Sequence, residues 1–145
     1  MNKSRAPRRR AAADDVMGAL MQAAHAVEHR LERSLAEVGL SGIRLAALTQ
    51  LVEAGEPVAL GELAERCACV RSNITQLVDR LEAEKLVRRV DDPQDRRSLR
   101  AAITPLGRER QAAGAKQVEE VRRQLAKALG AIDPAALKRA LAELG

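Results

Sequence analysis

The amino-acid sequence predicts a mainly α-helical fold with a minor β component. Ala and Leu dominate the apolar residues, which favours helices, and aromatic residues are absent. Apolar residues recur at steps of three and four positions along much of the 145-residue chain, as they do on one face of a helix. Two short segments, residues 86–90 and 99–103, read instead as strands separated by a polar loop.

The first predicted helix runs from about Ala13 to Val38, ends near Gly39 and carries a narrow apolar stripe. A narrow stripe on a long helix fits a partner helix better than a globular core, so we expect this helix to mediate dimerisation. The stripe consists of Met17, Leu20, Ala24, Val27, Leu31, Leu35 and Val38.

Three shorter helices are predicted in the middle of the chain, at residues 43–54, 60–67 and 71–84. Gly55 closes the first of them, and Pro57–Val58 form a short extended piece before the second. A tight turn separates the second from the third, which is the layout of a helix-turn-helix.

Two further helices are predicted after the hairpin. Thr104 provides an N-cap and Pro105 a first helical residue, so a long helix is expected to about Leu129. Asp133 and Pro134 start a final helix by the same logic.

The formal net charge of +5 is concentrated at the start of the chain. Five of the 25 basic residues lie within the first ten positions, so the remaining chain carries 20 basic residues against 20 acidic ones. Residues 1–12 are therefore predicted to form a disordered basic arm. A solubilising tail and a phosphate-binding arm are both consistent with this composition. The five residues are Lys3, Arg5, Arg8, Arg9 and Arg10.

Composition also narrows the function. Proteins usually hold single-stranded nucleic acid by stacking its bases on aromatic rings, and these are absent. No segment has the apolar length of a membrane span or the pattern of a signal peptide, so we expect a cytoplasmic protein without a membrane partner. No phosphate loop, metal-ligand set or nucleophile–base pair stands out, so we expect neither an enzyme nor a cofactor.

The predicted helix at residues 71–84 leaves small hydroxyl and amide side chains on its outer face, which suit base edges and phosphates. Gln76 has the amide needed to pair with adenine, and Arg80, one turn later, suits a phosphate. An ordinary solvated helix face is the alternative interpretation. The outer set consists of Ser72, Asn73, Thr75, Gln76, Asp79 and Arg80.

Arginines gather on the predicted hairpin. An exposed tip has no structural need for the adjacent pair Arg96 and Arg97, whereas a narrow minor groove attracts arginine. We expect Asp95, two residues before Arg97, to hold that guanidinium in place. A solvated loop with local ion pairs is the alternative. The arginines are Arg88, Arg89, Arg96, Arg97 and Arg100.

The segment from residue 62 to residue 107 resembles the winged helix-turn-helix of the MarR family of transcriptional regulators. The matching pieces are Glu62-Leu63-Ala64, Leu77-Val78-Asp79-Arg80-Leu81-Glu82, Leu86-Val87, Asp92-Pro93, Asp95-Arg96-Arg97 and Ile103-Thr104 with Gly107. The order of the flanking long helices extends the resemblance to nearly the whole chain. It implies a winged helix-turn-helix with long N- and C-terminal dimerisation helices, divided into residues 43–104 for DNA binding and residues 13–42 with 105–145 for dimerisation.

The resemblance also implies a homodimer on a pseudo-palindromic, double-stranded operator, with each fourth helix in a major groove and each wing in a minor groove. The implied DNA-contacting residues are Ser72, Asn73, Thr75, Gln76, Arg80, Asp95, Arg96 and Arg97. The chain departs from the family at Lys85, where a glycine usually ends the fourth helix, which predicts a strained or shifted helix end. Ala59 and Val70 replace the usual capping residues. The missing aromatic residues argue against the family's common phenolic-ligand mode.

Two residue pairs suggest regulation. Cys67 and Cys69 are interpreted either as inert buried thiols or as a redox switch beside basic neighbours. His25 and His29 stand one helical turn apart, which suits a transition metal, but they make no full ligand set, and a solvated or interfacial pair is the simpler interpretation.

The leading interpretation is therefore a dimeric DNA-binding repressor that an unknown small ligand releases. An oxidant- or metal-sensing regulator on the same scaffold is an alternative that differs in its trigger. A helical interaction module that does not bind DNA is the alternative from another class.

Overall fold

The computed structural model describes the backbone of residues 6–143 and the side chains of residues 15–70 and 72–143. The chain is mainly helical, with one small sheet, as the sequence predicts. The elements are α1 (Ala6–Ala36), α2 (Gly42–Ala54), β1 (Val58–Ala59), α3 (Leu60–Arg66), α4 (Arg71–Ala83), β2 (Val87–Asp91), β3 (Leu99–Ile103), α5 (Pro105–Ala128) and α6 (Pro134–Ala142).

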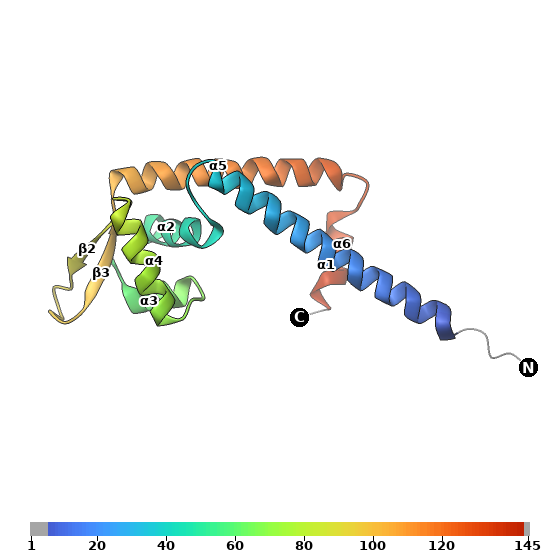
Figure 1. Ribbon diagram of the computed structural model, residues 1–145, viewed down its shortest axis with the longest axis horizontal. Coiled ribbons are helices and arrows are strands. Elements are labelled where there is room, and N and C mark those ends of the chain that lie inside the picture. Colours follow the sequence, from blue (N-terminus) through green and yellow to red (C-terminus); the bar gives the residue numbers. More distant parts are fainter. Residues whose placement is uncertain (1–5, 144–145) are drawn as a thin grey trace, which may run out of the picture.

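The molecule has a compact end and an open end (Figure 1). The compact end, which we call the winged unit, consists of α2, α3, α4 and the sheet, over residues 42–103. Helix α5 leaves this unit, and α1 packs against α5 near the unit before the two helices diverge (Figure 1). No helix in the described part of the chain is long and apolar enough to cross a membrane.

The helix α1 begins earlier than the sequence analysis expects. It starts at Ala6 rather than near Ala13, so the prediction of a disordered arm over residues 1–12 is corrected for residues 6–12. The physical reason lies in the sequence itself, because Ala11 to Ala13 are strong helix formers and Pro7 is tolerated in a first turn. Residues 1–5 lie outside the described residues.

The sheet has three antiparallel strands in the order β1-β3-β2. Strand β2 pairs with β3 in the predicted hairpin, with Val87 opposite Ile103 and Asp91 opposite Leu99. The extended piece predicted around Val58 becomes β1, which pairs with the other edge of β3. The central strand thereby ties the start of α3 to the hairpin.

One core fills the winged unit and continues into α1 and α5. The inner face of α4 is buried, while Leu35 and Leu40 bring the end of α1 into the same cluster. Burying a Leu or Ile side chain contributes about 1.5–3 kcal/mol. The largest side chains with almost no exposure are Leu35, Leu48, Leu51, Leu63, Ile74, Val78, Leu81, Leu86 and Val87.

The start of α5 is fastened to the turn between α4 and β2. The Thr104 hydroxyl donates to the Lys85 carbonyl oxygen at 2.7 Å, and the Thr104 N–H donates to the Leu86 carbonyl oxygen at 3.1 Å. The same hydroxyl oxygen caps α5 by accepting from the Gly107 N–H at 3.0 Å. The predicted N-cap is confirmed, and it also joins α5 to the end of α4.

Gly107 permits this junction because no side chain fits there. A Cβ at residue 107 would lie 2.0 Å from the Leu86 carbonyl oxygen, far inside van der Waals contact. The glycine at this position in the Thr-x-x-Gly pattern is therefore explained by close approach of backbone to backbone.

Two helices of the winged unit end on a non-glycine residue in the left-handed region. Ala68, after α3, has φ 50°, and Lys85, after α4, has φ 60°. Each turn is closed by a pair of hydrogen bonds of the Schellman type. The outer bond of the pair runs from the Cys69 N–H to the Ala64 carbonyl oxygen in the first turn, and from the Leu86 N–H to the Leu81 carbonyl oxygen in the second. The strain predicted at Lys85 is confirmed. Gly39, after α1, also has a left-handed φ, but glycine adopts it without strain because it has no Cβ.

We expect Gly107→Ala to lower the free energy of unfolding by roughly 3 kcal/mol or more, because the α5 start must move away from Leu86. Urea denaturation followed by circular dichroism measures the loss. Gly18→Ala is the matched control, since a Cβ at residue 18 meets nothing within 4 Å. Equal stability of the Gly107→Ala variant and the wild type would contradict the close contact.

We expect Lys85→Gly to raise the free energy of unfolding by up to about 1 kcal/mol, because relief of the left-handed strain exceeds the added freedom of the unfolded chain. Lys85→Ala is the control, since it removes the exposed side chain and keeps the Cβ. Thermal denaturation of both variants separates strain from side-chain effects. A destabilised Lys85→Gly beside a neutral Lys85→Ala would disprove the strain argument.

Candidate nucleic-acid interface

Helix α4 presents the predicted polar face to solvent. Ser72, Asn73, Gln76 and Arg80 are exposed, and Thr75 lies on the same side. The opposite side is closed by the core residues Ile74, Val78 and Leu81. This division places hydroxyl, amide and guanidinium groups along one outer face, where they can meet base edges and phosphates.

The first turn of α4 has no side-chain cap. Val70 stands at the N-cap position and offers no side-chain oxygen to the N–H groups that follow it. Those N–H groups and the positive end of the helix dipole favour an anion such as a phosphate. The predicted absence of a capping side chain at Val70, like that at Ala59 before α3, is confirmed.

The wing is the loop between β2 and β3, and its tip carries Arg96 and Arg97. Both side chains are exposed, and neither has an ion-pair partner among the described residues. In Figure 1 the wing tip and the start of α4 lie on the same side of the winged unit, away from α5. The two guanidinium groups at the wing tip are therefore available to an anionic partner.

Asp95 acts on the backbone of the wing. Its carboxylate accepts from the Arg97 N–H at 2.9 Å, and its carbonyl oxygen accepts from the Ser98 N–H at 2.9 Å. The expectation that Asp95 holds the Arg97 guanidinium is therefore wrong. An aspartate accepts readily, in an Asx turn, from the backbone N–H of the residue two positions later. It reaches the guanidinium at the end of that residue's long side chain less readily. Asp95 shapes the loop and leaves the guanidinium outside.

The side chain of Arg100 is held by contacts within the fold and does not extend from the surface. Its Nε donates to the Asp92 carboxylate at 2.9 Å, and its Nη1 donates to the Pro57 carbonyl oxygen at 3.2 Å. The side chain of Asp92 is almost fully buried. Hydrogen bonds from the Gln94 N–H and the Arg100 guanidinium lower the pKa of Asp92, so it stays charged. This pair fastens the base of the wing to β1.

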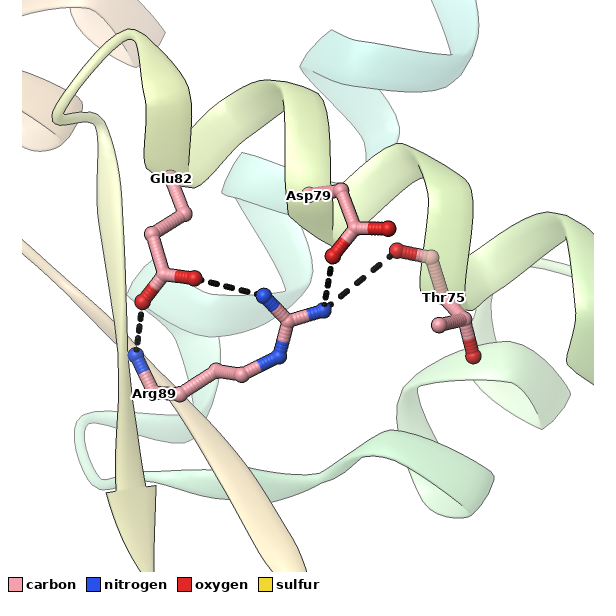
Figure 2. Close-up of polar contacts among 4 residues, drawn as sticks. All are labelled: Thr75, Asp79, Glu82 and Arg89. Atoms are coloured by element: carbon pink, nitrogen blue, oxygen red, sulfur yellow. Dashed lines mark hydrogen bonds and ion pairs between the residues drawn. The ribbon is translucent and has the colours of Figure 1, made fainter.

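Arg89 joins β2, the strand that leads into the wing, to α4 (Figure 2). From β2 its Nη1 donates to Glu82 and its Nη2 donates to Asp79, each at 2.5 Å, and Nη2 lies 3.5 Å from the Thr75 carbonyl oxygen. The Arg89 N–H also donates to Glu82 at 2.9 Å. Backbone and guanidinium donors of Arg89 together lower the pKa of Glu82. We call Arg89, Asp79 and Glu82 together the Arg89 clasp.

The clasp changes the sequence-based interpretation of two residues. Asp79 was placed on the outer face of α4 and Arg89 among the basic groups of the hairpin, and the structure pairs them with each other. The i, i+3 spacing of Asp79 and Glu82 could have indicated one shared cation. The sequence does not say which arginine it is, because the choice depends on the turn at Lys85.

The two candidate regulatory pairs lie in different places. His25 and His29 are exposed on α1, and no group of three or more His, Cys, Asp or Glu suited to a metal occurs among the described residues. Cys67 and Cys69 flank the turn after α3, and both are half-buried free thiols. Burial, and then the nearby Cys69, raise the pKa of Cys67, which disfavours its thiolate as a peroxide-reactive group.

We expect the Arg89 clasp to make stability depend on acid pH. The depressed folded-state pKa of Glu82 means that its contribution is complete above the unfolded value of about 4.3 and is lost as pH falls through the lower folded value. Glu82→Gln should lose about 1 kcal/mol or less at neutral pH, since solvent screens the partly exposed pair, and should show a flatter acid slope. Chemical denaturation at several pH values measures both.

Glu120→Gln is the matched control, because Glu120 pairs with Arg123 on the surface of α5, away from the wing. An acid slope in Glu82→Gln as steep as that of the wild type would show that the clasp contributes nothing.

The model of the MarR family matches residues 38–98. A curated relative, the uncharacterized HTH-type transcriptional regulator YsmB of Bacillus subtilis (strain 168), is 30% identical over 93 residues, which cover 64% of this chain. The match spans 63% of the relative's length, slightly less than two thirds.

Two proteins of known structure are similar over most of the chain. A probable transcriptional regulator from Pseudomonas aeruginosa is 30% identical with a TM-score of 0.72, covering 92% of this chain and 99% of its own. The transcriptional repressor CouR bound to a 23-mer DNA duplex is 29% identical with a TM-score of 0.73, covering 87% of this chain and 89% of its own. CouR from Rhodococcus jostii RHA1 bound to p-coumaroyl-CoA is 26% identical with a TM-score of 0.70, covering 91% of this chain and 90% of its own.

Proposed function

Since this chain belongs to the MarR family of winged helix-turn-helix regulators, we propose that it is a homodimeric repressor that binds double-stranded DNA. The observation that carries the proposal is the free polar surface shared by α4 and the wing tip. The side chains of Gln76, Arg80, Arg96 and Arg97 are exposed there, and none forms a hydrogen bond or ion pair with another described residue. CouR, which is similar over most of its length, is a repressor solved on a DNA duplex.

The two parts of this surface suit two grooves. Helix α4 has the width that a major groove accepts, and the amide of Gln76 can pair bidentately with an adenine edge. The wing tip offers Arg96 and Arg97 to the negative potential of a narrow minor groove. Arg80 and the start of α4, which no side chain caps, fit the phosphates between these sites.

The dimer is supported by apolar surface at the open end of the molecule. Val16, Met17 and Met21 on α1 are about 60% exposed, and Met17 belongs to the predicted apolar stripe. Leu129 and Ile132, after α5, are also exposed. A second copy of the chain would cover these groups and set two α4 helices one turn of DNA apart.

Release by a small ligand is supported by a cavity between α1 and α5. Its volume is about 370 Å³, and its lining includes His29, Arg30, Arg33 and the single carboxylate Glu37. The two arginines have no ion-pair partner among the described residues, so an anionic ligand would gain charge-assisted contacts. CouR has also been solved with bound p-coumaroyl-CoA, and this supports the proposal that the present chain binds a small effector.

We expect two substitutions on the DNA surface to act differently. Gln76→Ala should relax the preference at one base pair by about 1–3 kcal/mol. Arg97→Ala should instead weaken binding to all DNA sequences and reduce by about one the slope of log affinity against log salt concentration. The measurement is selection from a random duplex pool, followed by fluorescence anisotropy at several salt concentrations.

Arg139→Ala is the charge-matched control, because Arg139 is exposed on α6, away from the winged unit. If Gln76→Ala, Arg97→Ala and wild type bound alike, or if no duplex were enriched, the interaction-module interpretation would replace DNA binding.

We expect Met17→Glu with Met21→Glu to give a monomer, because the dimer would have to bury two unpaired carboxylates from each chain. Analytical ultracentrifugation measures the change. Ala19→Glu with Gln22→Glu places the same charge on the opposite, polar face of α1 and should leave the dimer intact. A double Met variant that stayed dimeric would exclude this face of α1 from the interface.

A further inference from the structure

The turn between α3 and α4 places two thiols beside the proposed DNA-reading face. Cys67 follows the last residue of α3 and packs against the core. Cys69, two residues later, lines a cavity of about 230 Å³ whose other lining residues include Asn73, Gln76 and Arg80. Nothing in the proposed DNA contacts uses either sulfur.

The backbone holds the two cysteines in a tight, preformed arrangement. The Cys69 N–H donates to the Ala64 carbonyl oxygen at 2.8 Å, and the Ala68 N–H donates to the Glu65 carbonyl oxygen at 3.1 Å. Between the cysteines, Ala68 takes a left-handed φ of 50°, which folds the chain instead of extending it. The Cα atoms of residues i and i+2 are therefore closer than the extended limit of about 7 Å. That Cys69 contributes to the raised pKa of Cys67 agrees with neighbouring sulfurs.

We propose that Cys67 and Cys69 form a dithiol site for a thiophilic trivalent arsenical, and that the bound arsenical blocks the outer face of α4. The first half of this inference rests on the turn and the cavity alone. The second half, loss of DNA binding, rests on the proposed function.

The number of available donors selects the class of ligand. No group of three or more His, Cys, Asp or Glu suited to a metal ion occurs in the described part of the chain, so two sulfurs must suffice. A monosubstituted arsenical, R–As(OH)₂, carries one carbon and needs two further ligands. Each thiol transfers its proton to an arsenic-bound hydroxyl, two As–S bonds replace two As–O bonds, and two waters leave. The oxidation state of arsenic does not change, so no oxidant or reductant is required.

The substituent R has a defined place to go. Cys69 lines the cavity together with the apolar residues Ile43 and Leu77 and the polar residues Asn73, Gln76 and Arg80 of α4. An aryl group held there would contact the apolar wall and stand between Gln76 or Arg80 and a DNA groove. Occupancy would thus remove base and phosphate contacts without unfolding the winged unit.

Phenylarsine oxide added to the full-length protein tests the site, with native mass spectrometry as the measurement. One phenylarsenic group should bind per chain, survive excess glutathione and be removed by 2,3-dimercaptopropanol. Cys67→Ser, Cys67→Ala and Cys69→Ser should each lose glutathione resistance, and the alanine variant guards against misfolding from a buried hydroxyl. A resistant adduct in any single variant, or no adduct in the wild type, would overturn the site.

Hydrogen exchange and DNA binding test the second half separately. Bound phenylarsenic should slow exchange of the amides of residues 73–80 in the absence of DNA, and should weaken binding to the selected duplex roughly tenfold or more, as removal of one base-pair contact does. Unchanged exchange and unchanged affinity in a fully occupied protein would overturn the blocking effect. If the free protein bound no duplex, the proposed function would fail, while the mass and exchange measurements would still decide the dithiol site and its effect on α4.

Discussion

The structure depends on the contact between Gly107 and the Leu86 carbonyl oxygen. At this point the proposed reading helix has just ended, the first wing strand is about to begin, and the long helix α5 starts. Because the backbones approach too closely for a Cβ, α5 can take only a narrow range of directions relative to α4. Thr104 reinforces the junction by donating to the Lys85 carbonyl oxygen and by capping α5. The angle between the proposed dimerisation helices and the DNA-reading unit is thereby set in one turn.

A second link reaches the same region from α2. Arg44 donates to the Gly39 carbonyl oxygen at the end of α1 and pairs with Glu84 at the end of α4. From α5, Arg110 donates to the Val38 carbonyl oxygen at 3.2 Å. Arg44 therefore links the end of α1 to the end of α4, and Arg110 holds α5 against the same end of α1. A change in how α1 and α5 diverge would act directly on the position of α4.

Charge is divided between structure and surface. Arg89 and Arg100 are neutralised by acidic partners inside the winged unit, while Arg96 and Arg97 remain at the wing tip. Beyond its first ten residues the chain has equal numbers of acidic and basic residues, so placement rather than net charge creates the cationic surface. The left-handed turns at Ala68 and Lys85 complete this arrangement, because they direct the chain into and out of α4 at the cost of local strain.

The sequence by itself determined most element boundaries and the outer face of α4, because these follow from local signals. Gly55, Thr104 and Asp133 cap their helices where the pattern predicts, and apolar spacing identifies the buried side of α4. Only the tertiary structure decided which arginines are free. The pairing of Arg89 with Asp79 and Glu82, and of Arg100 with Asp92, depends on how strands and helices fold across the Lys85 turn. Ion pairs between distant segments leave no periodic trace in the sequence, whereas caps and helical faces do.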